Sequence, residues 1–230
     1  MKKIAIFVEG MTEQEFVVWL VKKIAGGKGL VIDLSKQHGG KVTITMTAVN
    51  PAINFYVLVV DCSSDAQVKS QIVIQYPTLI VQGFSSIIGL RDIYPLPIAD
   101  LPKVRQHLQA GLPAGPVIPI IHLAIMEIEA WFISELTHFA VLDNKLTVPQ
   151  IVASGFPVTT ARSDSWEHPA QVLHDIYKIA KLGYMKGGAK TRSKVQRTIA
   201  ALSYTQLCQG SVATSPCLTS FIELLDAELV

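Results

Sequence analysis

An apolar run near the N-terminus, followed at once by a helical pattern, most constrains the fold of this chain. Residues 4–8 (IAIFV) contain no polar side chain, which is typical of a buried strand. Apolar residues then recur at helical spacing over residues 16–24. Thr12 and Glu15 have the spacing of a capping box, so we expect Thr12 to cap this helix. A strand that leads directly into a helix is the building unit of an α/β sheet, and such sheets bind ligands where their strands end.

The side chain at that strand end is a carboxylate, because Glu9 follows the apolar run and Gly10 follows Glu9. A glycine at this place lets a backbone or a metal-bound group approach closely. The segment is not a nucleotide phosphate loop, since it lacks both the glycine-rich run and the Lys-Ser/Thr pair.

Strand-like and helix-like runs alternate through the first part of the chain. We expect strands at residues 4–8, 42–49, 55–60, 85–90 and 117–126, and helices at 66–82 and 101–110. This alternation predicts an α/β fold of the Rossmannoid kind, with a mostly parallel sheet flanked by helices. Asn50-Pro51 is a turn signal, so the strands on either side of it are expected to form one antiparallel pair.

Strand-like runs stop after residue 142. Helical patterns follow at residues 169–182, 193–202 and 215–229. We therefore expect an α/β core over residues 1–142 and a helical C-terminal lobe, residues 143–230, packed on that core.

Composition argues against a membrane or secreted protein. The longest apolar runs fall well short of the roughly 20 residues that a membrane span requires. The N-terminus reads as a strand rather than as a leader peptide, and the three cysteines lack metal-ligand spacing. We expect a cytoplasmic protein with reduced thiols.

The net charge of +2 is unevenly distributed. Residues 176–222 contain seven basic side chains and no acidic one, while the rest of the chain carries 13 basic and 18 acidic. The basic stretch either meets a polyanion or forms a solvated helical face. Four of its cations could follow a nucleic-acid backbone, with Tyr184 stacking on a base, unless the segment is a solvated loop. These four are Lys186, Lys190, Arg192 and Lys194.

Several acidic residues come directly after apolar strand runs. In a parallel sheet these strand ends meet at one edge, and clustered carboxylates repel each other unless a cation holds them. Oxygen ligands of this kind suit Mg²⁺ or Mn²⁺. The sequence therefore predicts a metal site at which Glu9 also acts as general acid or base. Its expected ligands are Glu9 and Asp92, joined by Glu127 or Glu129.

Two further side chains have more than one interpretation. Asp61 could belong to the acidic site, but an Asx-type turn is favoured, with Asp65 capping the helix that follows. Arg91 could neutralise the carboxylates or contact a substrate phosphate; a structural ion pair is the alternative.

Three motifs occur in order along the chain: VEGMTEQEF at residues 8–16, IIGLRDIYP at 87–95, and MEIEAWF at 126–132, followed by His168-Pro169. Together they resemble a bacterial TOPRIM-like family related to OLD-type nucleases and associated with phage-defence loci. The resemblance covers most of the chain. It implies a TOPRIM-like sheet whose metal is held by a glutamate after the first strand and an Asp-x-Asp after a later one.

Glu9 and Asp92 match the family's first two carboxylate positions. The second aspartate position holds Tyr94, which cannot ligate Mg²⁺ in the same way, so Glu127 or Glu129 could supply the missing carboxylate.

The resemblance implies a Mg²⁺-dependent nuclease, or a related phosphoryl-transfer protein, that acts on nucleic acid in phage defence. The alternative is a catalytically inactive TOPRIM-like binding or regulatory module that partners an ATPase. The chain has no Walker motif, so such an ATPase would be a separate protein.

Overall fold

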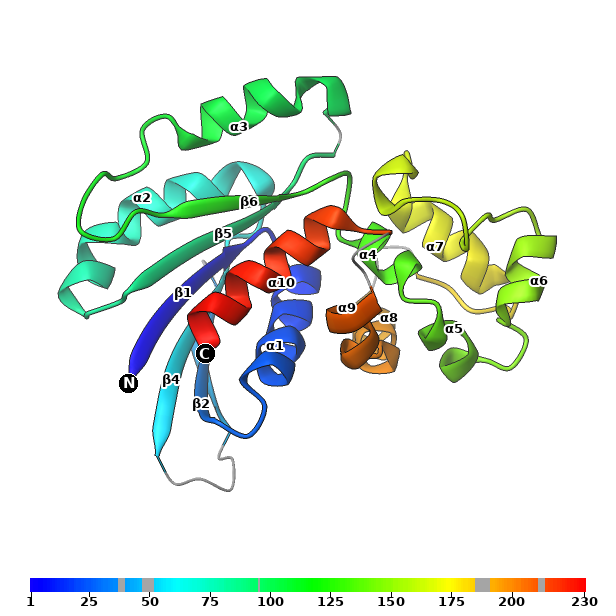
Figure 1. Ribbon diagram of the computed structural model, residues 1–230, viewed down its shortest axis with the longest axis horizontal. Coiled ribbons are helices and arrows are strands. Elements are labelled where there is room, and N and C mark those ends of the chain that lie inside the picture. The colour runs from blue at the N-terminus through cyan, green and yellow to red at the C-terminus, as the bar shows by residue number, and fades with distance from the viewer. Residues whose placement is uncertain (37–39, 47–51, 95, 185–190, 211–213) are drawn as a thin grey trace. The chain divides into compact units, whose positions relative to one another are not determined.

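The computed structural model describes residues 1–36, 40–46, 52–94, 96–184, 191–210 and 214–230 (Figure 1). These residues form two compact units. The first contains Met1–Asp92, Pro97–Leu123 and Glu223–Val230, and the second contains Ile93–Leu96 and Ala124–Ile222. The division thus follows residue 123 rather than the expected 142, because the chain leaves the sheet where its last strand ends.

The sheet of the first unit has six strands in the order β3-β2-β4-β1-β5-β6. Their bounds are β1 Lys2–Val8, β2 Gly29–Lys36, β3 Gly40–Met46, β4 Ile53–Asp61, β5 Ser86–Asp92 and β6 Ile120–Ala124. Strand β1 pairs in parallel with β4 and β5, and β2 pairs in parallel with β4. The predicted α/β fold with a mostly parallel sheet flanked by helices is confirmed.

Strand β2 is absent from the sequence prediction, and it changes the predicted pairing. The antiparallel partner of β3 is β2, not β4, because β2 lies between them. The Asn50-Pro51 turn lies outside the described residues. The apolar pattern of β2 is broken by Asp33, which is nevertheless buried because its carboxylate accepts a hydrogen bond from the Tyr56 hydroxyl. A buried polar side chain that is hydrogen-bonded across strands interrupts the apolar run, so the hydrophobic pattern does not predict the strand.

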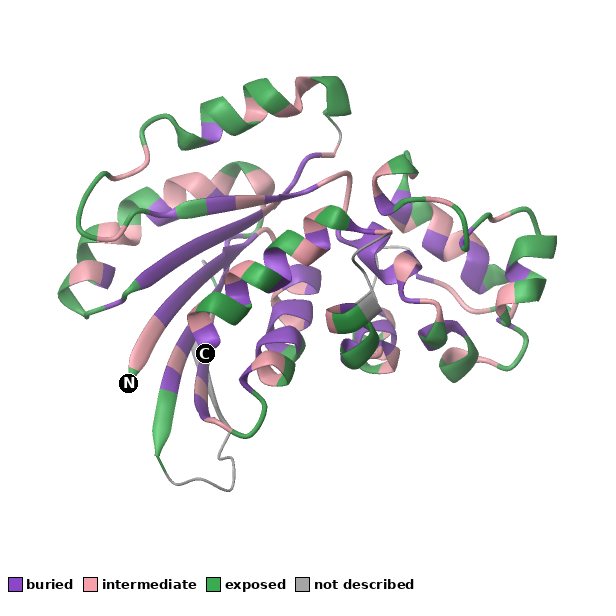
Figure 2. Cartoon of the chain, viewed as in Figure 1, coloured by how far each residue is buried: buried purple, intermediate pink, exposed green. Residues whose placement is uncertain are grey.

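Helices cover both faces of this sheet. They are α1 Met11–Ala25, α2 Asp65–Val81 and α3 Leu101–Gln109. On one face, Ala5 and Phe7 of β1 share a core with Val68 and Ile72 of α2. Alternate side chains of β1 point to the opposite face. Figure 2 shows β1 and β5 buried along most of their length. Burying each large apolar side chain of β1 stabilises the fold by about 1.5–3 kcal/mol.

The start of α1 differs from the predicted capping box. The helix begins at Met11, its N-cap position is Gly10, and no side chain caps it. Thr12 instead lies buried inside the first turn. The capping-box prediction is therefore wrong, because the chain enters the helix two residues earlier than the Thr-x-x-Glu spacing indicates.

Every regular element described after β6 is a helix. They are α4 Glu129–Ser134, α5 Thr137–Leu142, α6 Val148–Ala153, the short 3₁₀ helix Ser163–Ser165, α7 Pro169–Lys178, α8 Thr191–Ala201, α9 Tyr204–Gly210 and α10 Pro216–Leu229. The last of these contributes residues to both units. The helices predicted at residues 169–182, 193–202 and 215–229 correspond to α7, α8 and α10.

The second unit has an aromatic core. Trp131 stacks on Phe221 with ring centroids 5.9 Å apart, and its indole N–H donates to the Cys217 sulfur at 3.1 Å. Tyr177 and Tyr184 are also fully buried and meet edge to face. No helix in the described part of the chain is long and apolar enough to cross a membrane.

Candidate functional site

Three neighbouring strands of the first unit end at the same edge of the sheet. The parallel register places Val8 of β1 opposite Asp61 of β4 and Leu90 of β5. Glu9 and Asp92 therefore follow or end adjacent strands, on the side where open α/β sheets bind ligands.

The structure brings Glu9 and Asp92 together through a hydrogen bond. The Glu9 Oε1 atom accepts from the backbone N–H of Asp92 at 2.5 Å. Asp92 itself is buried at this edge. The contact joins the turn after β1 to the end of β5 and fixes the orientation of the Glu9 carboxyl.

Further carboxylates surround Glu9 and change its protonation. Burial raises the pKa of Glu9 from 4.5 to about 8, with help from the charges of Glu13 and Asp65 and against the Asp92 N–H and Arg91. Glu13 is close, because a Cβ atom at Gly10 would lie 3.4 Å from its Oε2. Without a cation beside it, the Glu9 carboxyl therefore holds its proton at neutral pH.

Asp61 forms the favoured turn. Its Oδ1 accepts from the Ser63 N–H at 2.8 Å, and Ser63 has a φ of 67°, which completes an Asx-type turn between β4 and α2. Its other oxygen lies 3.6 Å from the Lys36 ammonium. Asp65 is the first residue of α2, and the N-cap position is Ser64, so the prediction that Asp65 caps this helix is wrong.

Cys62 follows Asp61 and is unsuited to nucleophilic chemistry. Burial raises the pKa of its thiol to about 12, and the nearby charges of Asp61 and Glu9 act in the same direction. The side chain is fully buried and remains a neutral thiol.

Arg91 forms an ion pair with Asp65, which agrees with the structural alternative given for this residue in the sequence analysis. Its Nη2 atom lies 3.1 Å from Asp65 Oδ2, and only 16% of the side chain is exposed. The buried Nε atom has no hydrogen-bond partner in the structure. The guanidinium is thus held beside the acidic residues with one donor still to be satisfied.

The other two predicted ligands belong to the second unit. Glu127 Oε2 accepts from the backbone N–H of Ala170 at 2.9 Å, in the first turn of α7, where a carboxylate suits the helix dipole. Glu129 is fully buried and accepts from the Tyr184 hydroxyl at 2.8 Å. Both carboxylates hold the helices of this unit together. That either joins Glu9 and Asp92 at a metal stays a prediction.

Tyr94, at the position where the resemblance implies an aspartate, has a packing role. Its backbone N–H donates to the Met126 carbonyl at 2.9 Å, and its ring meets His168 edge to face with centroids 5.5 Å apart. Met126 has a φ of 68°, which directs the chain from the end of β6 into Glu127. The first two motifs therefore meet through Glu9 and Asp92 in the first unit, and the last two meet through Tyr94 and Met126 in the second.

The predicted nucleic-acid contacts fall in two places. Lys186 and Lys190 lie outside the described residues. Arg192 and Lys194 belong to α8. The prediction that Tyr184 stacks on a base is wrong, since its ring is fully buried and its hydroxyl is directed to Glu129.

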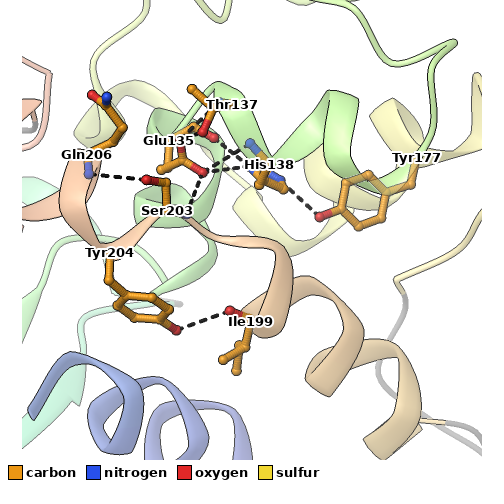
Figure 3. Close-up of polar contacts among 8 residues, drawn as sticks. All are labelled: Glu135, Thr137, His138, Tyr177, Ile199, Ser203, Tyr204 and Gln206. Carbon is orange, nitrogen blue, oxygen red and sulfur yellow. Dashed lines mark hydrogen bonds and ion pairs between the residues drawn. The ribbon is translucent and has the colours of Figure 1, made fainter. Parts of the chain in front are cut away.

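A buried polar network in the second unit was not predicted (Figure 3). His138 is fully buried, with Nδ1 against the Glu135 carbonyl oxygen and Nε2 3.0 Å from the Tyr177 hydroxyl. Burial lowers the pKa of His138 to about 4, so the ring is neutral at physiological pH. The Glu135 carboxylate accepts from the backbone N–H groups of Thr137, His138 and Ser203 at 2.9–3.2 Å.

This network connects the start of α5 to α7 and to the start of α9. The sequence contained one signal for this network: Glu135 lies two residues before the first residue of α5, and helix starts favour acidic side chains. The partners on the other helices are 39 and 68 residues away in the chain. Since its bonds are satisfied internally, we assign it to stability rather than catalysis.

Among the described residues, no group of three or more His, Cys, Asp and Glu side chains lies close enough to hold a metal ion. Mg²⁺ commonly uses one or two protein carboxylates and completes its shell with water and substrate phosphate, and carboxylates are the donors that Glu9 and Asp92 offer.

Comparisons of this chain with protein-family models, with curated proteins and with solved structures find no match.

Proposed function

We propose that this protein is a Mg²⁺- or Mn²⁺-dependent nuclease, or a related phosphoryl-transfer protein, that acts on nucleic acid. The observation that carries the proposal is the position of Glu9. Its partly buried carboxyl lies at the edge where open α/β sheets bind ligands, accepts from the Asp92 N–H, and has a pKa raised to about 8. Such a carboxyl destabilises the fold, and groups of this kind concentrate at functional sites.

Glu9 and Asp92 are the proposed metal ligands. When bound, the ion would polarise the scissile phosphate and orient the attacking water. Glu9 would release its proton as the cation takes its place, which makes metal affinity dependent on pH.

The proposed chemical role of Glu9 is proton transfer. As a metal ligand Glu9 is ionised, so it would accept the proton of the attacking water, and positioned bases of this kind accelerate reactions about 10²–10⁴-fold. Arg91 would direct its unsatisfied Nε donor to a substrate phosphate, while the ion pair with Asp65 keeps the guanidinium in place. Lys186, Lys190, Arg192 and Lys194 are the further proposed contacts to nucleic acid.

The test is cleavage of single- and double-stranded DNA and RNA by purified protein with Mg²⁺ or Mn²⁺. Glu9→Gln should lower the rate about 10²–10⁴-fold while the fold is kept. Glu223→Gln, an exposed glutamate on α10, is the matched control and should cleave like wild type. Equal residual activity in wild type and Glu9→Gln would mean that the cleavage comes from a contaminant.

A specific observation favours a second candidate, an inactive TOPRIM-like module that binds nucleic acid or partners an ATPase. Tyr94 occupies the second aspartate position and packs on His168. Calorimetric titration with Mg²⁺ and Mn²⁺ separates the two candidates. Absence of binding at millimolar metal would favour the module, and binding that Asp92→Asn weakens would favour the enzyme. The resemblance to phage-defence proteins suggests the same biological setting for both.

A further inference from the structure

Basic side chains lie beside Gly183, which follows α7 in the described part of the chain. Arg197 Nη2 donates to the Gly183 carbonyl at 3.0 Å, and Lys194 Nζ lies 4.0 Å from the position that a Gly183 Cβ would take. Lys181 is two residues earlier in the same loop, and Lys178 ends α7. We refer to Lys178, Lys181, Lys194 and Arg197 as the Gly183 basic cluster.

The ring of His174 lies near two of these cations, Lys178 and Lys194. Its ring lies 3.5 Å from the same Gly183 Cβ position, and its Nδ1 accepts from the Tyr184 N–H at 3.0 Å, which fixes the loop against α7. The pKa of His174 is lowered, first by burial and then by the charge of Lys178, with a smaller contribution from Lys194. Lysines from both helices therefore act on one ring beside Gly183.

In the sequence, the segment that carries the cluster is richer in basic than in acidic residues. Asp175 pairs with Lys178 at 2.9 Å, but residues 176–222 include no acidic side chain. Lys178 and Lys181 are exposed. Among the described residues, the buried Nε of Arg197 has no hydrogen-bond partner. A concentration of positive charge of this kind attracts an anionic partner with several charges.

We propose that the Gly183 basic cluster binds the phosphate backbone of double-helical nucleic acid without reading its bases. The identity of the polyanion rests on the proposed function. Proteins that hold single strands provide exposed aromatic rings for base stacking. The two aromatic rings nearest the cluster, Tyr177 and Tyr184, are fully buried. A duplex instead offers one phosphate charge per about 1.7 Å of helix, which suits a group of cations without a stacking surface.

An anionic membrane is a less suitable partner for this surface. Helices that lie in a membrane interface place large apolar side chains beside their cations. Between residues 153 and 229, the described part of the chain exposes no large apolar side chain. The two large apolar side chains of α8, Val195 and Ile199, are buried.

The experiment measures binding without metal, so that it does not depend on catalysis. In EDTA, fluorescence anisotropy would follow a labelled 20-base-pair duplex and one of its strands across a salt series. We expect wild type to bind the duplex more tightly than the strand. Lys181→Gln/Lys194→Gln should bind the duplex roughly 10-fold more weakly and lower the slope of log K against log salt by about 2.

The matched control is Lys103→Gln/Lys145→Gln, which removes two exposed lysines outside the cluster and should bind as wild type does. Equal losses in both double variants, an unchanged salt slope, or tighter binding to the strand would overturn the proposal. Preference for vesicles of anionic lipid over the duplex would assign the surface to membranes instead. Normal duplex binding with no cleavage would reject the proposed enzyme alone, and cleavage with unaltered binding in the cluster variant would reject the cluster alone.

Discussion

The side chain of Glu9 is held by the backbone of Asp92, whose N–H donates to Glu9 Oε1 at 2.5 Å. One candidate ligand is therefore oriented by the residue that carries the other. Because Glu9 follows β1 and Asp92 ends β5, their separation is set by the pairing of these two strands rather than by two loops.

Glu9→Gln should stabilise the protein at alkaline pH. The folded-state pKa of Glu9 is raised to about 8 from 4.5, so the stability associated with this group is present below pH 4.5 and is lost as pH rises through 8. Glutamine keeps the acceptor for the Asp92 N–H and carries no charge. At about 1.4 kcal/mol per pKa unit the shift corresponds to at most about 5 kcal/mol, and because the side chain is partly exposed the gain at pH 9 should be about 2–4 kcal/mol.

Urea unfolding of both proteins at pH 5 and pH 9 provides the measurement. The difference between them should grow with pH, and Glu223→Gln should show no such growth. A Glu9→Gln variant that is less stable than wild type at pH 9 would contradict the raised pKa.

Asp92→Asn should weaken metal-dependent cleavage in a way that added metal partly restores. The substitution weakens a proposed ligand but leaves the Glu9 carboxyl and its backbone donor in place. Cleavage rates measured across a Mg²⁺ series should show a displaced midpoint and a largely preserved maximum. If saturating metal restores nothing, Asp92 has a role other than ligation.

The second unit should lose stability in mild acid because of His138. Its pKa falls from 6.5 to about 4 on folding, so the unfolded chain binds a proton first as the pH decreases. The stability associated with the neutral ring is complete above pH 6.5 and is lost as pH falls toward 4, by about 3 kcal/mol at 1.4 kcal/mol per unit.

Denaturant unfolding between pH 7 and pH 4 tests this, with the exposed His107→Gln as control. His138→Gln should be less stable at pH 7, because it leaves Tyr177 or the Glu135 carbonyl without its partner, and should depend less on pH. An unchanged pH dependence in His138→Gln would place the acid-sensitive group elsewhere.

Tyr184→Phe should destabilise the fold by about 1–3 kcal/mol, since it removes the hydroxyl that donates to a fully buried carboxylate group. A double-mutant cycle with Glu129→Gln gives the energy of the pair. Independent, additive effects of the two substitutions would contradict the contact.

The sequence was most informative where the residues of a single strand are enough to predict the strand and the side chain at its end. The apolar run of β1 and the acidic residues that follow β1 and β5 required only local reading, and they place Glu9 and Asp92 at one edge. Asp33 shows the opposite case, since the hydroxyl that permits its burial in β2 comes from Tyr56 on another strand. A hydrophobic pattern cannot include a partner that only the folded sheet supplies.

Tyr184 illustrates the same limit in the second unit. The segment around it is rich in Gly and Lys, which favour a solvated loop, yet its ring lies in the core, where Glu129, 55 residues earlier, accepts its hydroxyl. The side chains bonded to His138 were similarly hidden. Hydrogen bonds between residues far apart in the chain leave no regular spacing in the sequence, so a periodic pattern cannot predict them.

The buried thiol of Cys62 gives the protein a built-in chemical reporter. Alkylating reagents require a thiolate, so Cys208 and Cys217, both partly exposed and both in the second unit, should react well before Cys62. Mass spectrometry would then show two labels appearing early and a third appearing only when the β4–α2 junction opens. The rate of that third event would report the local opening of the strand end next to Glu9, with no mutation introduced into the site.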